Sequence, residues 1–405
     1  MKIALIKEQK NPPDRRVVLT PAQAAELVKK YPGLEIVAQS SPHRAFSDDE
    51  YRQAGIPVVD DVSDADVLLG VKEVPVEALI PGKKYFFFSH TIKKQPHNRK
   101  LLRAILDKNI ELYDHETLTG PDGIRLVAFG YYAGVVGAYN AIRTYGLKSG
   151  LFHIPRAIDL HDKQEMIRVL REIYPQLPPI KIVLTGKGRV GNGAKEILDA
   201  MGIREVSPEE FLSRDDFGEP VYTQIDVDWY NKHKEGKAFD FQEFFTHPER
   251  FEGDFGKFTK AADIYIAGHF YGTGAPYILT REHLQAPDNR IRVVADISCD
   301  IGGPIASTIR ASTIDNPVYG YDPATGKETD YRLPLAIAVM AVDNLPNEIA
   351  RDASEGFGSK FMTHIIPALI EGDKDGILER ARITQDGQLT PRYSYLQDYV
   401  DGTEE

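Results

Sequence analysis

The sequence predicts an α/β protein built from two domains. The chain has 405 residues, which is long enough for more than one domain. Its first third alternates short apolar strand patterns with amphipathic helix patterns, which is typical of a mainly parallel sheet flanked by helices. A second strand–helix alternation starts near residue 180, and a glycine-rich turn opens it.

The first third contains several regular elements in order. We expect strands at residues 2–6, 34–38, 67–71, 85–88 and 111–113, and helices at 22–30, 51–54 and 97–108. Thr20 and Pro21 suit the N-cap and the first position of the helix at 22–30. A stretch rich in Gly, Ala and aromatic residues at 128–145 predicts a long connecting helix that leaves the first domain.

The second region is predicted to begin with a buried strand at 180–184 and a helix at 194–201. Residues 217–263 are polar and irregular, and we interpret them as an insertion. The apolar run at 333–342 is expected to return the chain to the first domain. The predicted domains are therefore residues 1–138 with 335–405, and residues 139–334.

Composition excludes several classes of protein. Acidic residues number 60 against 49 basic ones, a net charge of −11, so a basic surface for nucleic acid is not expected. No apolar run reaches the ~18 residues of a membrane helix. Cys299 is the single cysteine, which excludes an intrachain disulfide and a cysteine-based zinc cluster, and the histidines form no H-E-x-x-H pattern. We therefore expect a cytoplasmic protein without a metal site.

The glycine-rich turn predicts a dinucleotide site. Gly186, Gly188 and Gly191 follow the predicted strand with G-x-G-x-x-G spacing and precede a helix. The first glycine makes the tight turn, the second lets a pyrophosphate approach the backbone, and the third allows close helix–strand packing. The free N–H groups of the helix N-terminus attract phosphates. A glycine-rich turn without a ligand is the alternative.

The choice between NAD(H) and NADP(H) rests on opposing signals. Glu205 lies about 20 residues beyond the loop, where an acid binds the ribose 2′-hydroxyl of NAD. Arg204 beside it, and Lys187 and Arg189 in the loop, suit the 2′-phosphate of NADP.

Reactive side chains follow two predicted strands of the first domain. Lys72 comes after the strand at 67–71, and His90 comes after the strand at 85–88. Ligands of open α/β sheets bind beyond the carboxyl ends of the strands, and both residue types transfer protons near neutral pH when their pKa values are tuned. Arg16 and Arg125 suit bidentate binding of carboxylates. Solvated surface side chains are the alternative for all four.

Several segments together resemble a known family. They are GVKEVP (70–75), FSHTIK (88–93), LYDHETL (112–118), VAFGYYAGVVGA (127–138) and the Gly186 loop. They look like the superfamily of alanine dehydrogenase, transhydrogenase and saccharopine dehydrogenase. FFFSHTIKKQPHNRKLLRAIL, THPERF, DISCDIGGPI, DNLPNEIARDASEGFG and ARITQDGQL read like the lysine–2-oxoglutarate reductase domain of bifunctional aminoadipic semialdehyde synthases.

The resemblance implies two Rossmann-like domains with the active site in a cleft between them. Residues 1–138 with 335–405 would be the substrate and catalytic domain, and residues 139–334 the dinucleotide-binding domain. The implied reaction condenses L-lysine with 2-oxoglutarate and reduces the imine to saccharopine with NAD(P)H. NADP(H) is favoured over NAD(H), because the relatives most similar in their motifs use it. The partners would be these small molecules, and the fold is compatible with a homo-oligomer.

The resemblance also assigns roles to residues. Lys72 and His90 would share acid–base catalysis. Substrate would contact Arg16, Lys93, Glu116 and Arg125. Cofactor would contact Gly186, Gly188, Arg189, Val190, Gly191, Arg204, Glu205 and Asp343. Val190 stands where relatives of the yeast type carry a cysteine in the glycine loop.

Two other functions stay open at this point. An alanine dehydrogenase, or another opine or amino-acid dehydrogenase, would use the same scaffold. A regulatory relative would bind the dinucleotide without turnover, although the presence of Lys72 and His90 disfavours it.

Overall fold

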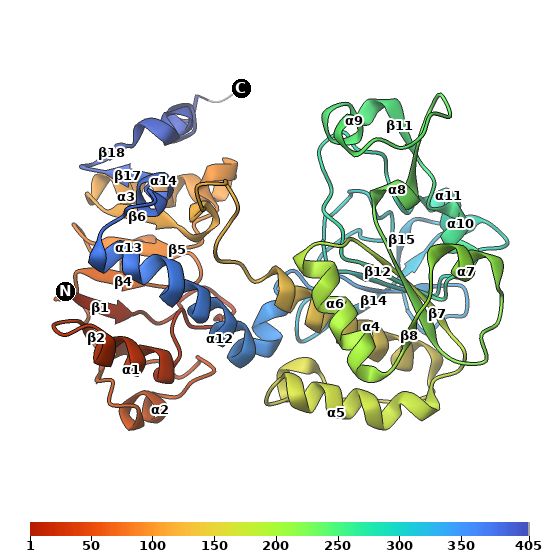
Figure 1. The fold of residues 1–405 in the computed structure, drawn as a ribbon, viewed down its shortest axis with the longest axis horizontal. Coiled ribbons are helices and arrows are strands. Elements are labelled where there is room, and N and C mark those ends of the chain that lie inside the picture. Colours follow the sequence, from red (N-terminus) through yellow and green to blue (C-terminus); the bar gives the residue numbers. More distant parts are fainter. Residues whose placement is uncertain (404–405) are drawn as a thin grey trace. The chain divides into compact units, whose positions relative to one another are not determined.

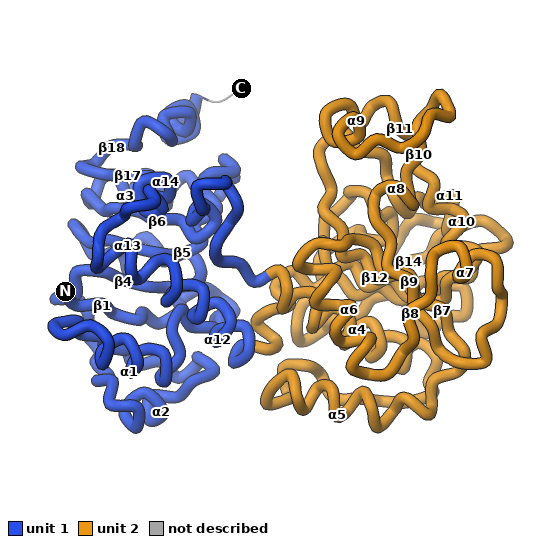
Figure 2. Tube along the Cα trace, viewed as in Figure 1, with its two compact units in different colours: residues 1–129, 350–405 blue, residues 130–349 orange. Residues whose placement is uncertain are grey.

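The computed structural model describes residues 1–403, and the chain divides into two compact units (Figure 2). Unit 1 comprises Met1–Phe129 and Ala350–Glu405, and unit 2 comprises Gly130–Ile349. Both are α/β units, as predicted. The cleft between them stays a prediction of the sequence.

Unit 1 is built on a six-stranded sheet in the order β3-β2-β1-β4-β5-β6, and all its strand pairs are parallel (Figure 1). This order is that of a doubly wound dinucleotide-binding sheet. The strands are β1 (Lys2–Leu5), β2 (Glu35–Gln39), β3 (Val58–Val59), β4 (Val67–Leu69), β5 (Lys84–Phe87) and β6 (Glu111–Asp114). The carboxyl ends of β4, β5 and β6 therefore share one edge.

The helices of unit 1 follow their sequence signals closely. Thr20 caps α1 (Pro21–Lys30) in a reciprocal capping box with Gln23, as the N-cap prediction requires. Ser47 caps α2 (Asp48–Gln53), and α3 (Arg99–Asp107) buries one apolar face in the core. The segment after residue 350 contributes α12 (Ala350–Lys360), α13 (Ile366–Glu371), α14 (Ile377–Ala381), β17 (Thr384–Gln385), β18 (Gln388–Leu389) and α15 (Gln397–Asp401).

Unit 2 is built on an eight-stranded sheet in the order β15-β14-β16-β13-β12-β7-β9-β8. The six strands from β16 to β8 run parallel, and β14 and β15 are antiparallel additions at one edge. The strands are β7 (Lys181–Thr185), β8 (Arg204–Glu205), β9 (Val221–Ile225), β12 (Ile264–Ala267), β13 (Val293–Asp296), β14 (Val318–Asp322), β15 (Lys327–Thr329) and β16 (Ile337–Met340). β7 lies in the interior of this sheet, and it directly precedes the glycine loop.

Helices α4 (Gly130–Ser149), α5 (Lys163–Ile173) and α6 (Arg189–Met201) pack together in unit 2 (Figure 1). The contact of α4 with α6 is made by main chain. A Cβ atom on Gly134 would lie 1.9 Å from the carbonyl oxygen of Val190, and one on Gly193 would lie 2.0 Å from that of Tyr131. Only glycine fits at these two positions.

The prediction of an insertion at residues 217–263 is wrong at its start. β9 lies inside residues 217–263 and is a central strand beside β7. Its polar Thr223 and Gln224 are buried, and they concealed the strand in the sequence. The remainder forms α8 (Val227–Tyr230), β10 (Asn231–His233), α9 (Phe241–Thr246), β11 (Phe251–Gly253) and α10 (Gly256–Thr259). Two short helices of the same unit are α7 (Pro208–Ser213) and α11 (Arg281–Gln285).

The chain crosses between units at 129–130 and 349–350, whereas the sequence predicted borders at 138–139 and 334–335. α4 packs against α6 of unit 2, so the chain passes from unit 1 to unit 2 before α4 begins. The apolar run at 333–342 does not return the chain, because its centre is β16, paired with β13 and β14. A buried strand and a buried connection have the same apolar pattern. Among the described residues, no helix is both long and apolar enough to cross a membrane.

Candidate active site

Three strand ends of unit 1 bring charged side chains together. Lys72 follows β4, His90 follows β5 and Glu116 follows β6. Asp114 connects two of these ends: its Oδ2 accepts the N–H of Ser89 at 2.9 Å and its Oδ1 accepts the N–H of Glu116 at 2.8 Å. The sequence predicted that Lys72 and His90 follow two strands, and in the structure these strands are parallel neighbours.

His90 is held in a fixed direction by a carboxylate. Its backbone is in the left-handed region with φ of 54°, an uncommon conformation for a non-glycine residue. Its Nδ1 donates to Oε1 of Glu73 at 2.6 Å, and Lys10 contacts Oε2 of Glu73 at 3.1 Å. Burial alone would raise the pKa of Glu73, but the hydrogen bond from His90 and the neighbouring positive charges lower that pKa to about 2. The other ring nitrogen of His90, Nε2, lies 3.7 Å from Glu116.

Lys72 is half-buried and lies among charged side chains of both signs. Burial lowers its pKa from the ordinary lysine value, and the charge of Arg16 lowers it further, against the opposing effect of Asp14. Arg16 is buried and donates two parallel hydrogen bonds to Asp14, from Nε at 2.9 Å and from Nη2 at 2.7 Å. A lysine with a lowered pKa has a larger neutral fraction near pH 7 and can accept a proton there.

Glu116 joins the two remaining cations that the sequence indicated. Its Oε2 lies 3.3 Å from Lys93 Nζ and 3.2 Å from Arg125 Nη2. Burial raises the pKa of Glu116, but the charges of Lys93, Arg125 and His90 lower it overall. The cluster therefore contains a carboxylate that stays ionised at neutral pH.

The two arginines lie over neighbouring aromatic rings. The guanidinium carbon of Arg16 is 4.2 Å from the ring centre of Phe129, and that of Arg125 is 6.0 Å from the ring centre of Phe88. The two rings are 6.0 Å apart, and Phe129 stacks on Phe357. These rings form one apolar floor beneath both guanidinium groups, and the cation–ring contacts help to hold them in place.

The glycine loop of unit 2 has the geometry of a phosphate cradle. Gly186 has φ of 97°, and its N–H donates to Ile225 at the end of β9. A Cβ atom on Gly191 would lie 2.0 Å from the carbonyl oxygen of Gly186, whereas a Cβ atom on Gly188 would meet nothing within 4 Å. Gly188 is also the N-cap of α6. The loop is therefore closed where its helix packs and open where a pyrophosphate would approach, so its residues fit a dinucleotide.

The other loop residues indicated by the sequence have different surroundings. Arg189 is exposed at the first position of α6. Val190, one residue on, lies near the start of α4, with its Cγ2 3.4 Å from where a Cβ atom of Gly130 would be.

The two residues expected to discriminate between cofactors lie on the edge strand β8, which pairs with β9 and not with β7. Arg204 donates to Glu219 at 2.7 Å, and Glu205 pairs with Lys195 at 2.5 Å. Glu205 nevertheless lines an open hollow together with Lys187 of the loop. Asp226 directly follows β9, the strand beside β7, so it occupies the strand end at which a ribose-binding acid is expected.

Asp343 follows β16 and lies near Cys299, which follows β13; Asp296, the last residue of β13, is also near Cys299. Burial and these aspartates raise the pKa of the Cys299 thiol to about 12, so it is not a nucleophile at neutral pH. Among the described residues, no group of three potential ligands is arranged to hold a metal ion.

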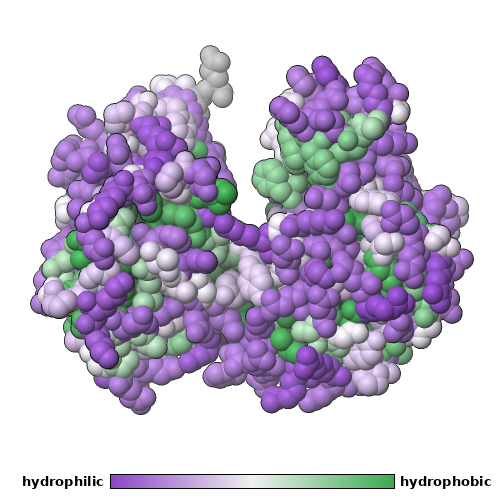
Figure 3. Space-filling model, viewed as in Figure 1, coloured by the Kyte–Doolittle hydropathy of each residue, from purple (hydrophilic) through white to green (hydrophobic). Residues whose placement is uncertain are grey.

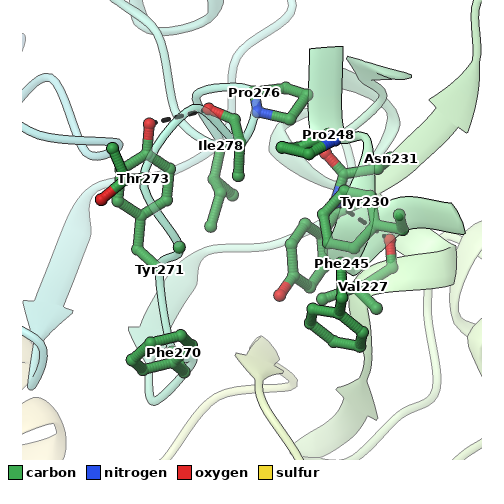
Figure 4. A pocket seen from close by; sticks show the side chains of 13 residues that line it. Val227, Tyr230, Asn231, Phe245, Pro248, Phe270, Tyr271, Thr273, Pro276 and Ile278 are labelled. Carbon is green, nitrogen blue, oxygen red and sulfur yellow. Dashed lines mark hydrogen bonds between the residues drawn. The ribbon is translucent and has the colours of Figure 1, made fainter. Parts of the chain in front are cut away.

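An apolar pocket lies between the loops that follow β9 and β12 (Figure 4). Val227, Tyr230 and Phe245 lie on one side, and Phe270 and Tyr271 lie on the other. Phe245 and Phe270 are 65% and 84% exposed. In Figure 3, a hydrophobic area lies in the upper part of unit 2, below a hydrophilic tip.

Sequence reasoning missed four charged residues of the unit 1 cluster: Glu8, Lys10, Asp14 and Glu73. Glu73 adjoins Lys72 in the sequence, and that adjacency was an available signal. The other three lie in the segment after β1, and their proximity to residue 72 depends on the pairing of β1 with β4.

Comparison with known protein families agrees with both units. The model of the alanine dehydrogenase/PNT N-terminal domain matches residues 4–136, and the model of the alanine dehydrogenase/PNT C-terminal domain matches residues 157–391. The chain belongs to the alanine dehydrogenase/PNT family. It is an oxidoreductase by that membership.

Relatives of this chain include two alpha-aminoadipic semialdehyde synthases. The chain is 29% identical to the mitochondrial alpha-aminoadipic semialdehyde synthase of Rattus norvegicus over 99% of its own length and 48% of the relative's. It is 30% identical to the alpha-aminoadipic semialdehyde synthase of Arabidopsis thaliana over 97% of its own length and 41% of the relative's. The chain thus spans less than half of each.

A third relative matches end to end. Saccharopine dehydrogenase [NAD(+), L-lysine-forming] of Candida glabrata is 25% identical over 95% of the chain and 98% of the relative. Among solved structures, an L-alanine dehydrogenase superposes with a TM-score of 0.68 at 18% identity, covering both chains fully. A transhydrogenase from Sinorhizobium meliloti superposes with a TM-score of 0.60 at 17% identity, covering 96% of this chain and 99% of that one. These likenesses establish the fold.

Proposed function

We propose that the chain is a saccharopine dehydrogenase of the lysine-forming type, a lysine–2-oxoglutarate reductase. The ε-amine of L-lysine adds to the ketone of 2-oxoglutarate, water leaves, and the imine accepts a hydride and a proton to give saccharopine. A bound nicotinamide supplies the hydride. The observation that carries the proposal is the pair of arginines over one aromatic floor beside Lys72 and His90.

The arginines support a substrate with more than one carboxylate. A guanidinium group binds a carboxylate through two parallel hydrogen bonds, which fixes both its position and its orientation. Arg16 and Arg125 supply two such groups, whereas a monocarboxylate such as alanine needs one. In the structure Asp14 and Glu116 occupy hydrogen-bonding positions on them, so substrate carboxylates would exchange with these acids.

Lys72 and His90 supply the proton transfers. Imine formation needs a neutral substrate amine, a proton for the departing water and a proton for the reduced nitrogen. The lowered pKa of Lys72 lets it accept and return a proton near neutral pH. His90 is oriented by Glu73 through Nδ1, which leaves Nε2 directed at the side of Glu116. The negative charge of Glu116 offsets Lys93 and attracts the ammonium form of lysine.

The test is nicotinamide oxidation followed at 340 nm with L-lysine plus 2-oxoglutarate, with saccharopine identified by mass spectrometry. Pyruvate plus ammonia is the parallel reaction. Lys72→Met should abolish most lysine-dependent turnover, and Lys29→Met, an exposed lysine on α1, is the matched control. Turnover with pyruvate and ammonia alone would instead make the chain an alanine dehydrogenase.

For the cofactor, the sequence favoured NADP(H), and we now propose NAD(H). The strand end beside the loop carries Asp226, the hollow is lined by Glu205, and Arg204 is paired with Glu219. A 2′-phosphate brings up to two negative charges, which these acids would repel. The name of the Candida relative specifies NAD(+).

Fluorescence titration gives the dissociation constants of NADH and NADPH directly. NADH should bind at least about tenfold more tightly, a difference of ~1.4 kcal/mol. Asp226→Ser should narrow that ratio while keeping the cap that Asp226 provides to Val227. Asp228→Ser, an exposed acid two residues on, is the control, and an equal change in both variants would assign the effect to net charge.

A homo-oligomer and a cytoplasmic location stay predictions of the sequence.

A further inference from the structure

Glu8 bridges two strand ends of unit 1 below Lys72. It follows β1, whose last ladder bond runs from the N–H of Ile6 to the carbonyl of Leu69 at the end of β4. Beyond that bond, the carboxylate of Glu8 accepts the backbone hydrogen bonds that a neighbouring strand would otherwise accept. Oε1 accepts the N–H of Val71 at 2.7 Å, and Oε2 accepts the N–H of Lys72 at 2.9 Å. One side chain thus satisfies two consecutive backbone donors.

The other side of the same segment is also fixed. The carbonyl of Val71 accepts the N–H of Phe88, and the N–H of Gly70 donates to Phe86, so β5 holds residues 70 and 71 from its side. A Cβ atom on Gly70 would lie 3.5 Å from Oε1 of Glu8, so the carboxylate rests against this turn. The N–H of Lys72 is held by Glu8, which makes Glu8 the contact that sets the direction in which the Lys72 side chain leaves the backbone.

We propose that Glu8 is a positioning residue for Lys72: its two-pronged grip on residues 71 and 72 holds the Lys72 amine among Asp14, Arg16 and Glu73. This inference rests on the proposed function only for its kinetic consequence. A lysine side chain has four rotatable carbon–carbon bonds, so its amine stays in place only if the backbone beneath it is fixed. A misplacement of about 1 Å in a proton-transfer group costs up to about a hundredfold in rate.

Glu8 lies among groups that shift its pKa in both directions. Burial raises the pKa of Glu8 to about 8, the charge of Asp14 raises it, and the two backbone hydrogen bonds and Arg16 lower it. Lys10, Lys72, Glu73 and His90 are the other titratable groups of this cluster.

The central variant is Glu8→Gln, which keeps the shape but replaces one acceptor oxygen with an NH2 group that faces a backbone N–H. We expect kcat to fall roughly tenfold to a hundredfold, with an unchanged dissociation constant for NADH. Glu26→Gln, an exposed glutamate on α1, is the matched control and should leave both unchanged. Glu8→Asp keeps the carboxylate on a shorter stem and should restore part of kcat. It also serves if Glu8→Gln does not fold.

A double-mutant cycle separates positioning from general damage. In a Lys72→Met background, Glu8→Gln should cause no further loss of kcat, because its effect passes through Lys72. A loss that multiplies in the double variant would overturn the proposal and make Glu8 a general stabilising residue.

A measurement without turnover keeps this inference distinct from the proposed reaction. Acetylation of Lys72 by acetic anhydride is followed against pH by peptide mass spectrometry, with Lys29 as the internal reference. In Glu8→Gln the half-point for Lys72 should move upward, because a displaced amine loses the burial that lowers its pKa. If this shift occurs in a protein that forms no saccharopine, the positioning role holds and the proposed reaction fails. An unshifted half-point in a folded variant would refute the positioning role.

Discussion

Two glycines of the same loop should respond oppositely to the same substitution. Gly191→Ala places a Cβ atom 2.0 Å from the carbonyl oxygen of Gly186, against a lower limit of 3.0 Å for such contacts. The obstacle is main chain, so the loop itself must move, and overpacking of this kind costs about 3 kcal/mol. For a unit of about 220 residues, each kcal/mol shifts Tm by roughly 2–4 °C. Tm should therefore fall by roughly 6–12 °C.

Gly188→Ala should leave stability unchanged and weaken cofactor binding. Gly188 has φ of −82°, which alanine adopts freely, and its Cβ atom would meet no atom of the protein within 4 Å. Its unfolding free energy should stay within ~0.5 kcal/mol of the parent's, as expected of surface substitutions. The added methyl group would occupy the space that a pyrophosphate needs, so NADH affinity should fall by at least about tenfold.

Differential scanning fluorimetry and NADH fluorescence titration on the two variants check both expectations. Saturating NADH should raise the Tm of the parent, since a ligand that binds only the folded state stabilises it by ~2.7 kcal/mol at a hundred times its Kd. A tenfold weaker affinity should remove about half of that increase at the same concentration. Parent-like NADH binding by Gly188→Ala would refute the cradle, and an unchanged Tm in Gly191→Ala would refute the packing argument.

Two buried carboxyls predict opposite pH dependences of stability. The pKa of Glu73 is lowered to about 2 in the folded protein, so its contribution is present above the unfolded value and is lost as pH falls from about 5 to 2; Glu73→Gln should flatten urea-unfolding stability over that range by up to ~3 kcal/mol. Burial raises the pKa of Glu348 to about 7, so its contribution is present below the unfolded value and is lost as pH rises through 7. Glu348→Gln keeps an acceptor for Asn140 and should raise Tm at pH 8 but not at pH 5, and a rise at both would contradict the titration argument.

Much of unit 1 and its cluster was predictable because it depends on local patterns. Alternating strand and helix signals place Lys72 and His90 at the carboxyl ends of strands, and parallel strands present those ends at one edge. Asp14 and Glu8 were not predictable in this way. Asp14 binds Arg16 two residues further on, but its proximity to Lys72 depends on the pairing of β1 with β4. Glu8 reaches Lys72 through the same pairing, and no short-range spacing relates residue 8 to residue 72.

The acid that we propose to discriminate between cofactors, Asp226, could not be predicted from the sequence for a related reason. Counting about 20 residues beyond the glycine loop reaches Glu205, but β8 is a two-residue edge strand. The strand that lies beside β7 starts at Val221, and its buried Thr223 and Gln224 give it a polar sequence. A rule that counts residues along the chain therefore reaches β8, and not the strand beside β7, when the sheet order is β7-β9-β8.

The glycines between α4 and α6 limit how the dinucleotide loop can be transferred to another protein. Gly134 and Gly193 let the backbones of α4 and α6 come into contact. The position of the N-terminal end of α6, where a phosphate would bind, is therefore set by the backbone of α4 and not by adaptable side chains. A graft of β7, the loop and α6 alone would lose that reference surface, and alanine at either glycine would push the helices apart. A transferred segment would therefore have to include at least residues 130–201, from the start of α4 to the end of α6.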